Sequence, residues 1–246
     1  MKTVHFVRHG ETEQNKDGIW QGHTNTQLSK TGKAQAKLLS KRINLKNQTV
    51  FTSDLARAKE TAYFLSDSPN VRENLREINV GDFTGKSVKE TYSNNLDIFD
   101  ALQYDTYVFP NGESVQEFKL RVQKEVDHIF DNIDEDSECV VVTHGFFIGT
   151  AIGLVLGFNQ YPYPIGNIQN TSISTVIKRD SVMQVNKFND AIHLPNSYID
   201  YPAKDKSRIL TFIRHGQTDS NTQGVWQGHV DNPLNTYGVE TAKQLK

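Results

Sequence analysis

An internal repeat limits the possible architectures of this chain more than any other feature of its sequence. Residues 2–40 and 208–246 align without a gap at an offset of 206 positions, with 16 identities among 39 aligned residues. A period of this length is that of a whole domain rather than of a solenoid unit. The sequence therefore predicts a complete domain at residues 1–190, a linker at 191–207 and the first segment of a second domain at 208–246.

The second copy stops inside the equivalent of the first helix of the first copy. Its expected strand, Ile209–Ile213, has no partner strand within residues 208–246. Three outcomes are open for this copy: disorder, docking on a sheet edge, or exchange with the strand at 3–7 of another copy. We favour disorder or loose docking, and we interpret the sequence as a partial sequence or a truncated gene product of a tandem two-domain protein.

Composition and charge exclude several classes of protein. Hydrophobic residues make up 36% and charged residues 23% of the chain, so a buried core is expected rather than wholesale disorder. The formal net charge is −2, whereas modules that bind nucleic acid usually have a basic bias. We therefore predict no nucleic-acid partner.

The cysteine count and the apolar segments indicate the compartment. The one cysteine, Cys139, lies in a strand-like apolar run and is interpreted as a core residue, so no internal disulfide is possible. This fits a reducing compartment. No signal peptide opens the chain, and the longest apolar-rich stretch, 146–158, is too short to cross a bilayer. We expect a cytoplasmic protein with no membrane partner.

Strand-like and helix-like segments alternate through the first copy. Strands are expected at 3–8, 49–53 and 138–143, and a closing hairpin at 172–178 and 182–188. Helices are expected at 29–43, at 113–133 and at 145–156, and another is expected to follow Ser53. Ser29 and Ser53 are the expected N-caps of the first helix and of the helix after the second strand. This alternation predicts an α/β fold, a three-layer α/β/α sandwich with a largely parallel central sheet.

Polar residues follow three of these strands. Arg8-His9-Gly10 ends the first strand, Ser53 ends the second and leads to Arg57, and His144-Gly145 follows the strand at 138–143. Folds of this class bind ligands beyond the carboxyl ends of their parallel strands. A single histidine after a strand is commonly structural, but two His-Gly pairs with two arginines predict one shared site.

Taken together, these motifs resemble the histidine phosphatase superfamily, the phosphoglycerate-mutase-like group, and are most similar to its small-metabolite phosphatases. The resemblance covers residues 3 to about 190. The matching stretches are Val7-Arg8-His9-Gly10-Glu11-Thr12 with Asn15, Ser53-Asp54-Leu55-Ala56-Arg57-Ala58 with Thr61-Ala62, Leu75-Arg76-Glu77 with Gly81 and Gly85, Gly112-Glu113-Ser114, and Thr143-His144-Gly145.

The resemblance implies a role for each matched residue in phosphomonoester hydrolysis. His9 would be the nucleophile and form a transient phosphohistidine, since a neutral imidazole is competent near pH 7. Arg8 and Arg57 have forked donors suited to phosphate oxygens, and Arg57 lies in the first turn of its helix. His144 would stabilise the transition state, and Asn15 would add a neutral donor.

Other polar residues have less certain positions in this scheme. Glu77 matches the general acid of the family, whereas the neighbouring Glu73 does not match the motif. Glu113 matches a position tied to loop order and is given no catalytic role. Three residues after the nucleophile loop are expected to line the pocket rim, where substrate contact and loop packing remain equally open: Gln21, Gly22 and His23.

Three alternatives remain beside a phosphatase of small phosphorylated metabolites. A metal hydrolase is disfavoured because neither an HExxH motif nor a local zinc-type ligand cluster occurs, so we expect no metal ion and no cofactor. A phosphoglycerate mutase is disfavoured by the short region between Glu77 and the long helix. A non-catalytic sensor of phosphorylated ligands would have lost the nucleophile or the acid, and both are present.

The sequence leaves the leaving group and the oligomeric state open. Five aromatic residues in the region 84–110 are expected to form a lid that selects the substrate: Tyr92, Phe99, Tyr104, Tyr107 and Phe109.

Overall fold

The computed structural model describes residues 1–43, 48–94, 106–158, 167–195 and 213–243. The chain divides into two compact units, Met1–Asp200 and Tyr201–Lys246. The two units are described in turn.

The first unit is built on a six-stranded mixed sheet with the strand order β3-β2-β4-β1-β5-β6. The strands are β1 (Lys2–Arg8), β2 (Thr49–Ser53), β3 (Asn70–Arg72), β4 (Glu138–Thr143), β5 (Ile173–Arg179) and β6 (Val182–Asp190). β3, β2, β4 and β1 pair in parallel, and β5 and β6 add an antiparallel hairpin beside β1. The predicted, largely parallel sheet is confirmed.

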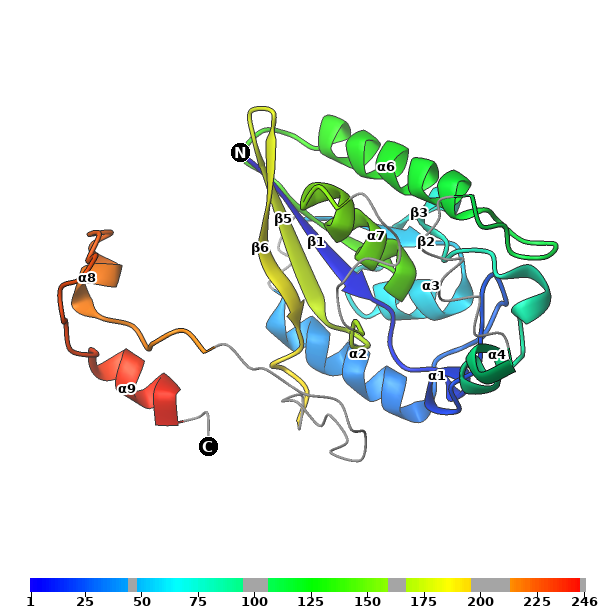
Figure 1. Ribbon diagram of the computed structural model, residues 1–246, viewed down its shortest axis with the longest axis horizontal. Helices are drawn as coiled ribbons and strands as arrows, with labels where there is room; N and C mark the ends of the chain where they lie inside the picture. The colour runs from blue at the N-terminus through cyan, green and yellow to red at the C-terminus, as the bar shows by residue number, and fades with distance from the viewer. Residues whose placement is uncertain (44–47, 95–105, 159–166, 196–212, 244–246) are drawn as a thin grey trace. The chain divides into compact units, whose positions relative to one another are not determined.

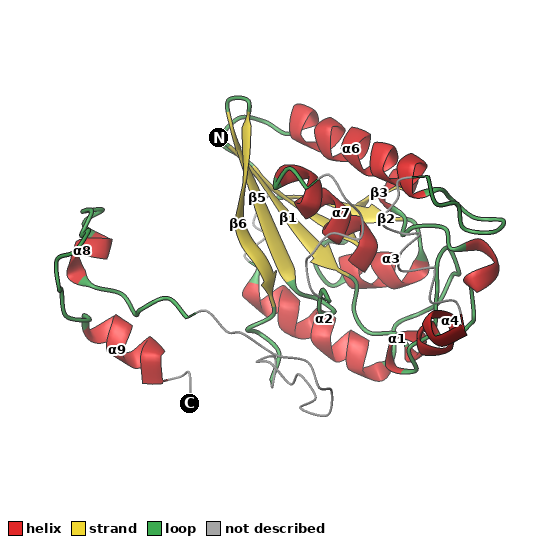
Figure 2. Cartoon of the chain, in the orientation of Figure 1, coloured by secondary structure: helices red, strands yellow, loops and turns green. Residues whose placement is uncertain are grey.

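Helices cover both faces of this sheet (Figures 1 and 2). They are α1 (Glu13–Lys16), α2 (Lys30–Arg42), α3 (Ala56–Tyr63), α4 (Val88–Asn94), α6 (Val115–Asn132) and α7 (Gly145–Val155). Two 3-10 turns, η1 (Glu73–Leu75) and η2 (Gly81–Phe83), lie between α3 and α4. α6 and α7 lie on one side of the sheet, and α2 and α3 lie on the other.

The period-two alternation of β4 explains the two helical layers. Cys139 and Val141 are buried in the core cluster that includes α6 and α7. Val140 and Val142 are buried in the cluster that includes α2 and α3. Because successive side chains of a strand point to opposite faces, a fully apolar strand requires cover on both sides. The three-layer sandwich and the core position of Cys139 are therefore confirmed, and burial raises the pKa of the Cys139 thiol to about 12.

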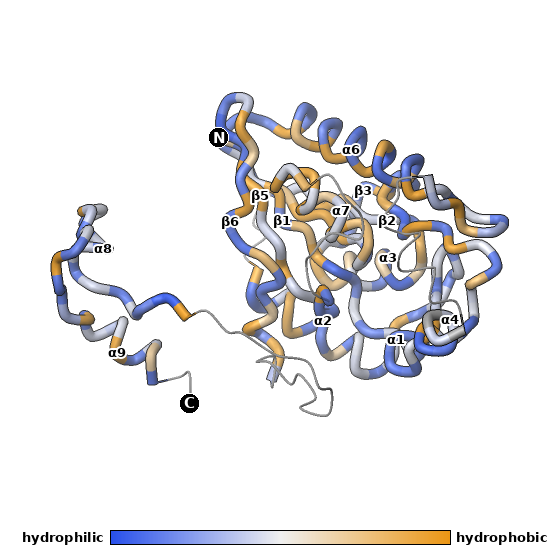
Figure 3. Tube along the Cα trace, viewed as in Figure 1, coloured by the Kyte–Doolittle hydropathy of each residue, from blue (hydrophilic) through white to orange (hydrophobic). Residues whose placement is uncertain are grey.

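The long helix α6 is amphipathic, as its spacing predicts. The apolar positions lie along the side that faces the sheet, and the charged positions lie on the outer side (Figure 3). Ser114 caps its first turn by accepting from the N–H of Glu117, whose carboxylate accepts from Ser114 in return.

Two expectations need correction. Ser53 is not the cap of α3, because Leu55 occupies the N-cap position and Ser53 Oγ instead accepts from the Leu55 N–H at 3.3 Å. Phe109 is not a lid residue, because it is fully buried and its ring packs against Trp20, Phe83 and Tyr107. The other expected lid residues Phe99 and Tyr104, and the side chain of Tyr92, lie outside the described part of the chain.

The registers of the parallel strands set the position of the site. Arg8 pairs with Thr143 across β1 and β4, and Thr52 pairs with Val142 across β2 and β4. The three strands therefore end at the same level, and the residues that follow them emerge together at one edge of the sheet.

The second unit reproduces the local structure that follows β1 in the first. It contains α8 (Asp219–Thr222) and α9 (Thr236–Lys243), and Thr218 caps α8 through Asn221 as Thr12 caps α1 through Asn15. Of the strand expected at 209–213, only residue 213 lies within the described residues.

One side-chain hydrogen bond occurs at the same place in both copies, although both of its residues differ between them. In the first, the Ser29 hydroxyl donates to Glu11 Oε1 at 2.9 Å. In the second, the Asn235 amide donates to Gln217 Oε1 at 3.0 Å. Both Ser29 and Asn235 also accept from the backbone N–H of a glycine three residues later. The second copy therefore keeps the same loop-to-helix bond with a different donor and acceptor.

Candidate active site

The loop after β1 holds His9 in one tautomer. The backbone N–H of His9 donates to the carbonyl of Thr143 at 2.9 Å, and the ring Nδ1 lies 2.7 Å from the carbonyl oxygen of Gly10. A carbonyl only accepts, so Nδ1 carries a proton, and in the neutral ring Nε2 keeps its lone pair. The side chain is 2% exposed. In its neutral form, His9 is thus fixed in the tautomer whose Nε2 is free.

Two glycines allow this loop to pack against α2. A Cβ on Gly10 would lie 2.6 Å from the carbonyl oxygen of Gly32, and a Cβ on Gly32 would lie 2.1 Å from the carbonyl oxygen of Glu11. The N–H of Gly10 also donates to Thr61 Oγ1 at 2.9 Å, which ties the loop to α3. The contacts of both helices therefore fix the His9 backbone.

His144, from the end of β4, lies beside His9. The two ring centroids are 5.2 Å apart, and His144 is fully buried. His144 also occupies the N-cap position of α7 without a side-chain capping bond.

Arg57, from the first turn of α3, is 1% exposed. Its two terminal nitrogens donate to the carbonyl oxygens of Thr24 and Gly22, each at 2.8 Å. Arg8 donates to the carbonyl oxygen of Ile168. Backbone oxygens thus position both guanidinium groups, and neither is neutralised by a direct ion pair among the described residues.

Several buried polar atoms of this site have no hydrogen-bond partner among the described residues. They are Nε of Arg8, Nε of Arg57, and both ring nitrogens of His144. Buried polar groups are nearly always paired, so an unpaired cluster of this kind requires an explanation. A bound anion such as a phosphoryl group would supply the missing acceptors.

The electrostatics of the site favour a neutral nucleophile. Burial, followed by the charges of Arg57 and Arg8, lowers the pKa of His9 well below its ordinary value. The same burial and charges lower the pKa of His144. Burial also lowers the pKa of Arg57 to about 10, which leaves it charged at neutral pH.

Glu77 lies beside these groups at the N-terminus of α7. Its Oε1 accepts from the N–H of Ile78 at 3.0 Å, and its Oε2 accepts from the N–H of Phe146 at 3.2 Å. Burial raises the pKa of Glu77, against these two bonds and the charges of Arg57 and Arg8. The structure thus brings this carboxyl to the same site as the predicted nucleophile. The competitor Glu73 is exposed and pairs with Arg76 instead.

Asn15 and Gln21 are tied to each other through Thr12. Asn15 Oδ1 accepts from the Thr12 backbone N–H at 3.2 Å as part of the α1 cap. Gln21, which is 8% exposed, accepts at its Oε1 from the hydroxyls of Thr12 and Thr26 at 3.0 and 2.7 Å. These contacts occupy the side-chain oxygens of both amides.

Gly22 and His23 contact protein groups of the site. Gly22 has a left-handed φ of +48°, and its carbonyl oxygen accepts from Arg57. A Cβ there would approach Val80 to 2.9 Å. His23 Nε2 lies 2.7 Å from the carbonyl oxygen of Glu77, so this nitrogen carries the proton. Both residues therefore connect this loop to Arg57 and Glu77.

The segment before β5 contributes contacts that the sequence reasoning missed. Asn170 Nδ2 donates to the carbonyl oxygen of His9 at 2.9 Å and to Asn15 Oδ1 at 3.3 Å. The Thr171 N–H donates to the carbonyl oxygen of Arg8 at 2.9 Å. These residues lie about 160 positions from the loop they hold and belong to no motif, so no sequence signal could have identified them.

The described residues contain neither a cluster suited to a metal ion nor a helix suited to a membrane. No group of three or more His, Cys, Asp or Glu side chains there is arranged to hold a metal ion. No helix in the described ranges is long and apolar enough to cross a membrane.

Comparison with known proteins places this geometry in a family. The sequence profile of the histidine phosphatase superfamily (branch 1) matches residues 4–191 and 210–246. The chain belongs to the histidine phosphatase superfamily. The second matched segment coincides with the internal repeat.

Similar proteins include both phosphatases and mutases of this superfamily. A metal-independent phosphoserine phosphatase from Arabidopsis thaliana is 30% identical, over 77% of this chain and 82% of that protein. An Enterobacter protein named probable phosphoglycerate mutase GpmB is 28% identical, over 84% of this chain and 99% of its own length. Like these superfamily members, the chain is an enzyme that acts on phosphate esters.

A solved structure matches the same fold with a ligand bound. A mutant phosphoserine phosphatase from Entamoeba histolytica in complex with phosphoserine has a TM-score of 0.71 and 28% identity, and the match covers 79% of this chain and 100% of that chain. A structure of phosphoserine phosphatase from the same organism in complex with 3-phosphoglyceric acid has a TM-score of 0.71 and 26% identity.

Proposed function

We propose that this protein is a phosphatase that hydrolyses phosphomonoesters of small metabolites through a phosphohistidine intermediate on His9. The observation that carries the proposal is the free Nε2 of a buried, neutral His9 beside unpaired donors of Arg8, Arg57 and His144. A nucleophile and a preorganised set of donors are what phosphoryl transfer demands of a protein. Glu77 adds a carboxyl whose raised pKa suits a general acid.

The residues act in two chemical steps. In the first, the Nε2 lone pair attacks phosphorus, the bond between phosphorus and the ester oxygen breaks, and Glu77 donates its proton so that the alcohol leaves. In the second, the Glu77 carboxylate accepts a proton from a water molecule that attacks phosphorus. The bond from phosphorus to Nε2 breaks, and inorganic phosphate leaves. Arg8, Arg57 and His144 hold the phosphoryl oxygens throughout.

The bound phosphate also changes the charge balance of the site. In the free enzyme, burial raises the pKa of Glu77, and the positive charges of Arg57 and Arg8 reduce this rise. A phosphate dianion neutralises these charges, so substrate binding favours the protonated acid that the first step requires. Asn15, Gln21, Gly22 and His23 complete the proposed pocket, the first as a donor to the phosphate and the others at its rim.

Phosphoserine and 3-phosphoglycerate are the first substrates to test. A similar phosphoserine phosphatase structure contains phosphoserine, and another contains 3-phosphoglyceric acid. Both are small molecules that carry a carboxylate beside the phosphate ester.

We propose further that residues 1–190 form the catalytic domain, with 191–207 as a linker to a second copy at 208–246, and that the protein acts in the cytoplasm.

The deciding experiment traps the intermediate. Labelled phosphoserine is mixed with the protein, the reaction is quenched in alkali because phosphohistidine is acid-labile, and the labelled peptide is identified. Label on the His9 peptide of the wild type and none on His9→Ala support the proposal. His215→Ala is the matched control, since the same substitution falls in the repeated loop. Wild-type turnover by His9→Ala would remove His9 from the mechanism.

A second assay separates hydrolysis from mutase activity. The protein is incubated with 3-phosphoglycerate and a bisphosphoglycerate primer, and both inorganic phosphate and 2-phosphoglycerate are measured. We expect phosphate release to exceed isomerisation. Isomerisation without phosphate release would identify a mutase instead.

A further inference from the structure

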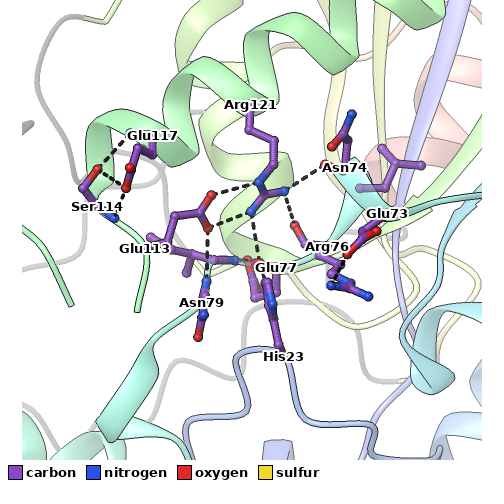
Figure 4. Close-up of polar contacts among 12 residues, drawn as sticks. His23, Glu73, Asn74, Arg76, Glu77, Asn79, Glu113, Ser114, Glu117 and Arg121 are labelled. Atoms are coloured by element: carbon purple, nitrogen blue, oxygen red, sulfur yellow. Dashed lines mark hydrogen bonds and ion pairs between the residues drawn. The ribbon is translucent and has the colours of Figure 1, made fainter. Parts of the chain in front are cut away.

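One guanidinium group holds the backbone on both sides of the proposed acid. Arg121, in α6, donates from Nη1 to the carbonyl oxygens of Asn74 and Arg76 at 2.8 and 2.9 Å. Its Nη2 donates to the carbonyl oxygen of Glu77 at 3.2 Å. Three carbonyls within four consecutive residues thus converge on a single side chain (Figure 4).

Glu113 fixes the guanidinium in this orientation. Its Oε1 accepts from Arg121 Nε at 2.9 Å, and its Oε2 accepts from Nη2 at 2.8 Å. Together with the three carbonyl bonds, this pair uses all five N–H donors of the arginine. Glu113 Oε2 also accepts from the N–H of Asn79 at 3.2 Å, on the far side of the acid. Arg121 and Glu113 therefore hold segment 74–79 together, the first by hydrogen bonds to three carbonyls and the second by a hydrogen bond from one backbone N–H.

We propose that Arg121, held by Glu113, is a positioning residue that places Glu77 for proton transfer to the leaving oxygen. This inference rests on the proposed phosphatase function. Segment 74–79 has no long helix or strand of its own: it starts in the short turn η1 and continues as a loop. The carbonyl of Leu75 accepts from the Thr143 hydroxyl at 2.6 Å, and that of Asn79 accepts from the Glu113 N–H at 2.9 Å. The carbonyls of Asn74, Arg76 and Glu77 instead accept from Arg121, so the position of the segment next to the carboxyl depends on this side chain.

Arg121 acts by geometry rather than by charge. The carboxylate of Glu113 forms an ion pair with the Arg121 guanidinium, and both side chains are less than a fifth exposed. Consistent with this, the charges that change the pKa of Glu77 come from Arg57 and Arg8. The carboxyl itself is aimed by two backbone N–H groups, so a shift of the segment would move it away from the ester oxygen.

The rim of the pocket reaches the same carbonyl. His23 Nε2 donates to the Glu77 carbonyl at 2.7 Å, which makes this oxygen a double acceptor. The loop that holds Arg57 through Gly22 is therefore linked to the loop that holds the acid.

The test compares two substrates that differ in their need for an acid. The leaving group of phosphoserine is the serine alkoxide, which requires protonation, whereas the leaving group of p-nitrophenyl phosphate is p-nitrophenolate, a stabilised anion. Arg121→Lys keeps the charge but has only three donors without a planar fork. We expect kcat for phosphoserine to fall about 10- to 100-fold, the cost of a misplacement of about 1 Å, with a much smaller fall for p-nitrophenyl phosphate.

Arg72→Lys is the matched control. Arg72 lies just before segment 74–79 and pairs with the buried Glu125 of α6, the helix that also carries Arg121. Among the described residues, its side chain donates to Glu125 and not to the carbonyls of residues 74–77. We expect this variant to change both substrates by the same factor. In a Glu77→Gln background, Arg121→Lys is expected to add almost nothing to the loss on phosphoserine.

Several outcomes would overturn the inference. An equal loss on both esters would show a general structural role, and a fully additive loss in the Glu77→Gln background would separate Arg121 from the acid. If Arg121→Lys does not fold, Glu113→Gln, which leaves the arginine in place, is measured on the same two esters with the same expected split. A wild type that hydrolyses neither ester would refute the phosphatase function itself, and the inference would fall with it.

Discussion

Glu77 accepts a hydrogen bond of 3.2 Å at its Oε2 from the backbone N–H of Phe146. Phe146 is the second residue of α7, and His144 is the N-cap of that helix. One helix terminus therefore positions both the proposed acid and a proposed phosphate ligand. The partial positive charge of the N-terminus also favours the carboxylate form that is left after proton donation.

The role of Glu77 predicts a dependence on the leaving group. Glu77→Gln keeps the size of the side chain but has no proton to donate, so turnover of phosphoserine is expected to fall roughly 10²–10⁴-fold. Turnover of p-nitrophenyl phosphate is expected to fall much less. The measurement is kcat on both esters, and Glu73→Gln, at the exposed carboxylate that pairs with Arg76, is the control. An equal loss on the two esters would count against an acid at position 77.

The pKa shifts predict an acidic pH optimum for kcat/KM. In the proposed mechanism His9 attacks as a neutral ring, and because its pKa is lowered it stays neutral well below pH 6.5. Glu77, the proposed acid, would donate as a neutral carboxyl, and because its pKa is raised it keeps its proton to a higher pH than an ordinary glutamate. Activity is therefore expected to persist on the acid side and to decline as rising pH deprotonates Glu77.

The Glu77→Gln variant checks this assignment. With phosphoserine as substrate, the alkaline decline is expected to disappear from its lower but flatter profile. An unchanged alkaline midpoint in the variant would assign that decline to another group.

The parts of the site that follow strands could be predicted from sequence, because strand ends in a parallel sheet share one edge. The apolar run of β4 and the glycine after each histidine located His9 and His144, and their rings do lie 5.2 Å apart. Arg57 was placed for the same reason, in the first turn of the helix after β2.

The supporting contacts could not be predicted, because they join distant segments through backbone oxygens. Arg121 reaches the carbonyl of Asn74 over 47 positions, and Asn170 reaches that of His9 over 161. Every residue has a carbonyl, so no residue type or spacing marks such an acceptor. The prediction of a Ser53 cap was wrong because Ser53 is the last residue of β2. The chain then bends at Asp54 and Leu55, and α3 begins after Leu55.

The contact between the nucleophile loop and α2 predicts an unusual glycine effect. Replacing a helical glycine with alanine ordinarily stabilises a protein by about 0.5–1 kcal/mol. At Gly32, the added Cβ would lie 2.1 Å from the Glu11 carbonyl oxygen, so Gly32→Ala is expected to lower the free energy of unfolding by about 2 kcal/mol or more. The measurement is urea unfolding, with the exposed Lys33→Ala of the same helix as control. A stabilised Gly32→Ala would show that the two segments can separate freely.

The loop around His215 has the same local structure as the loop around His9, yet we expect it to have no phosphatase activity of its own. His215 Nδ1 lies 2.7 Å from the carbonyl oxygen of Gly216, as His9 Nδ1 does from Gly10, and a Cβ on Gly238 would meet the Gln217 carbonyl at 2.1 Å. The loop and its glycine contact are thus the same in both copies. The surroundings differ, because His215 is exposed whereas His9 lies in a buried site with Arg57 and His144.

Residues 208–246 align with 2–40, and the counterparts of Arg57, Glu77 and His144 fall beyond that span. In a protein made of residues 1–246, His215 therefore lacks aligned partners that could neutralise the charge of a phosphoryl transition state. His215→Ala is therefore expected to leave kcat and KM for phosphoserine within about twofold of the wild type, as is usual for exposed side chains away from a site. Removal of residues 196–246 is expected to do the same. His9→Ala, the same change in the same loop, is the positive control. A large loss in His215→Ala with an intact fold would mean that the second copy completes a site that the residues of the first unit otherwise form.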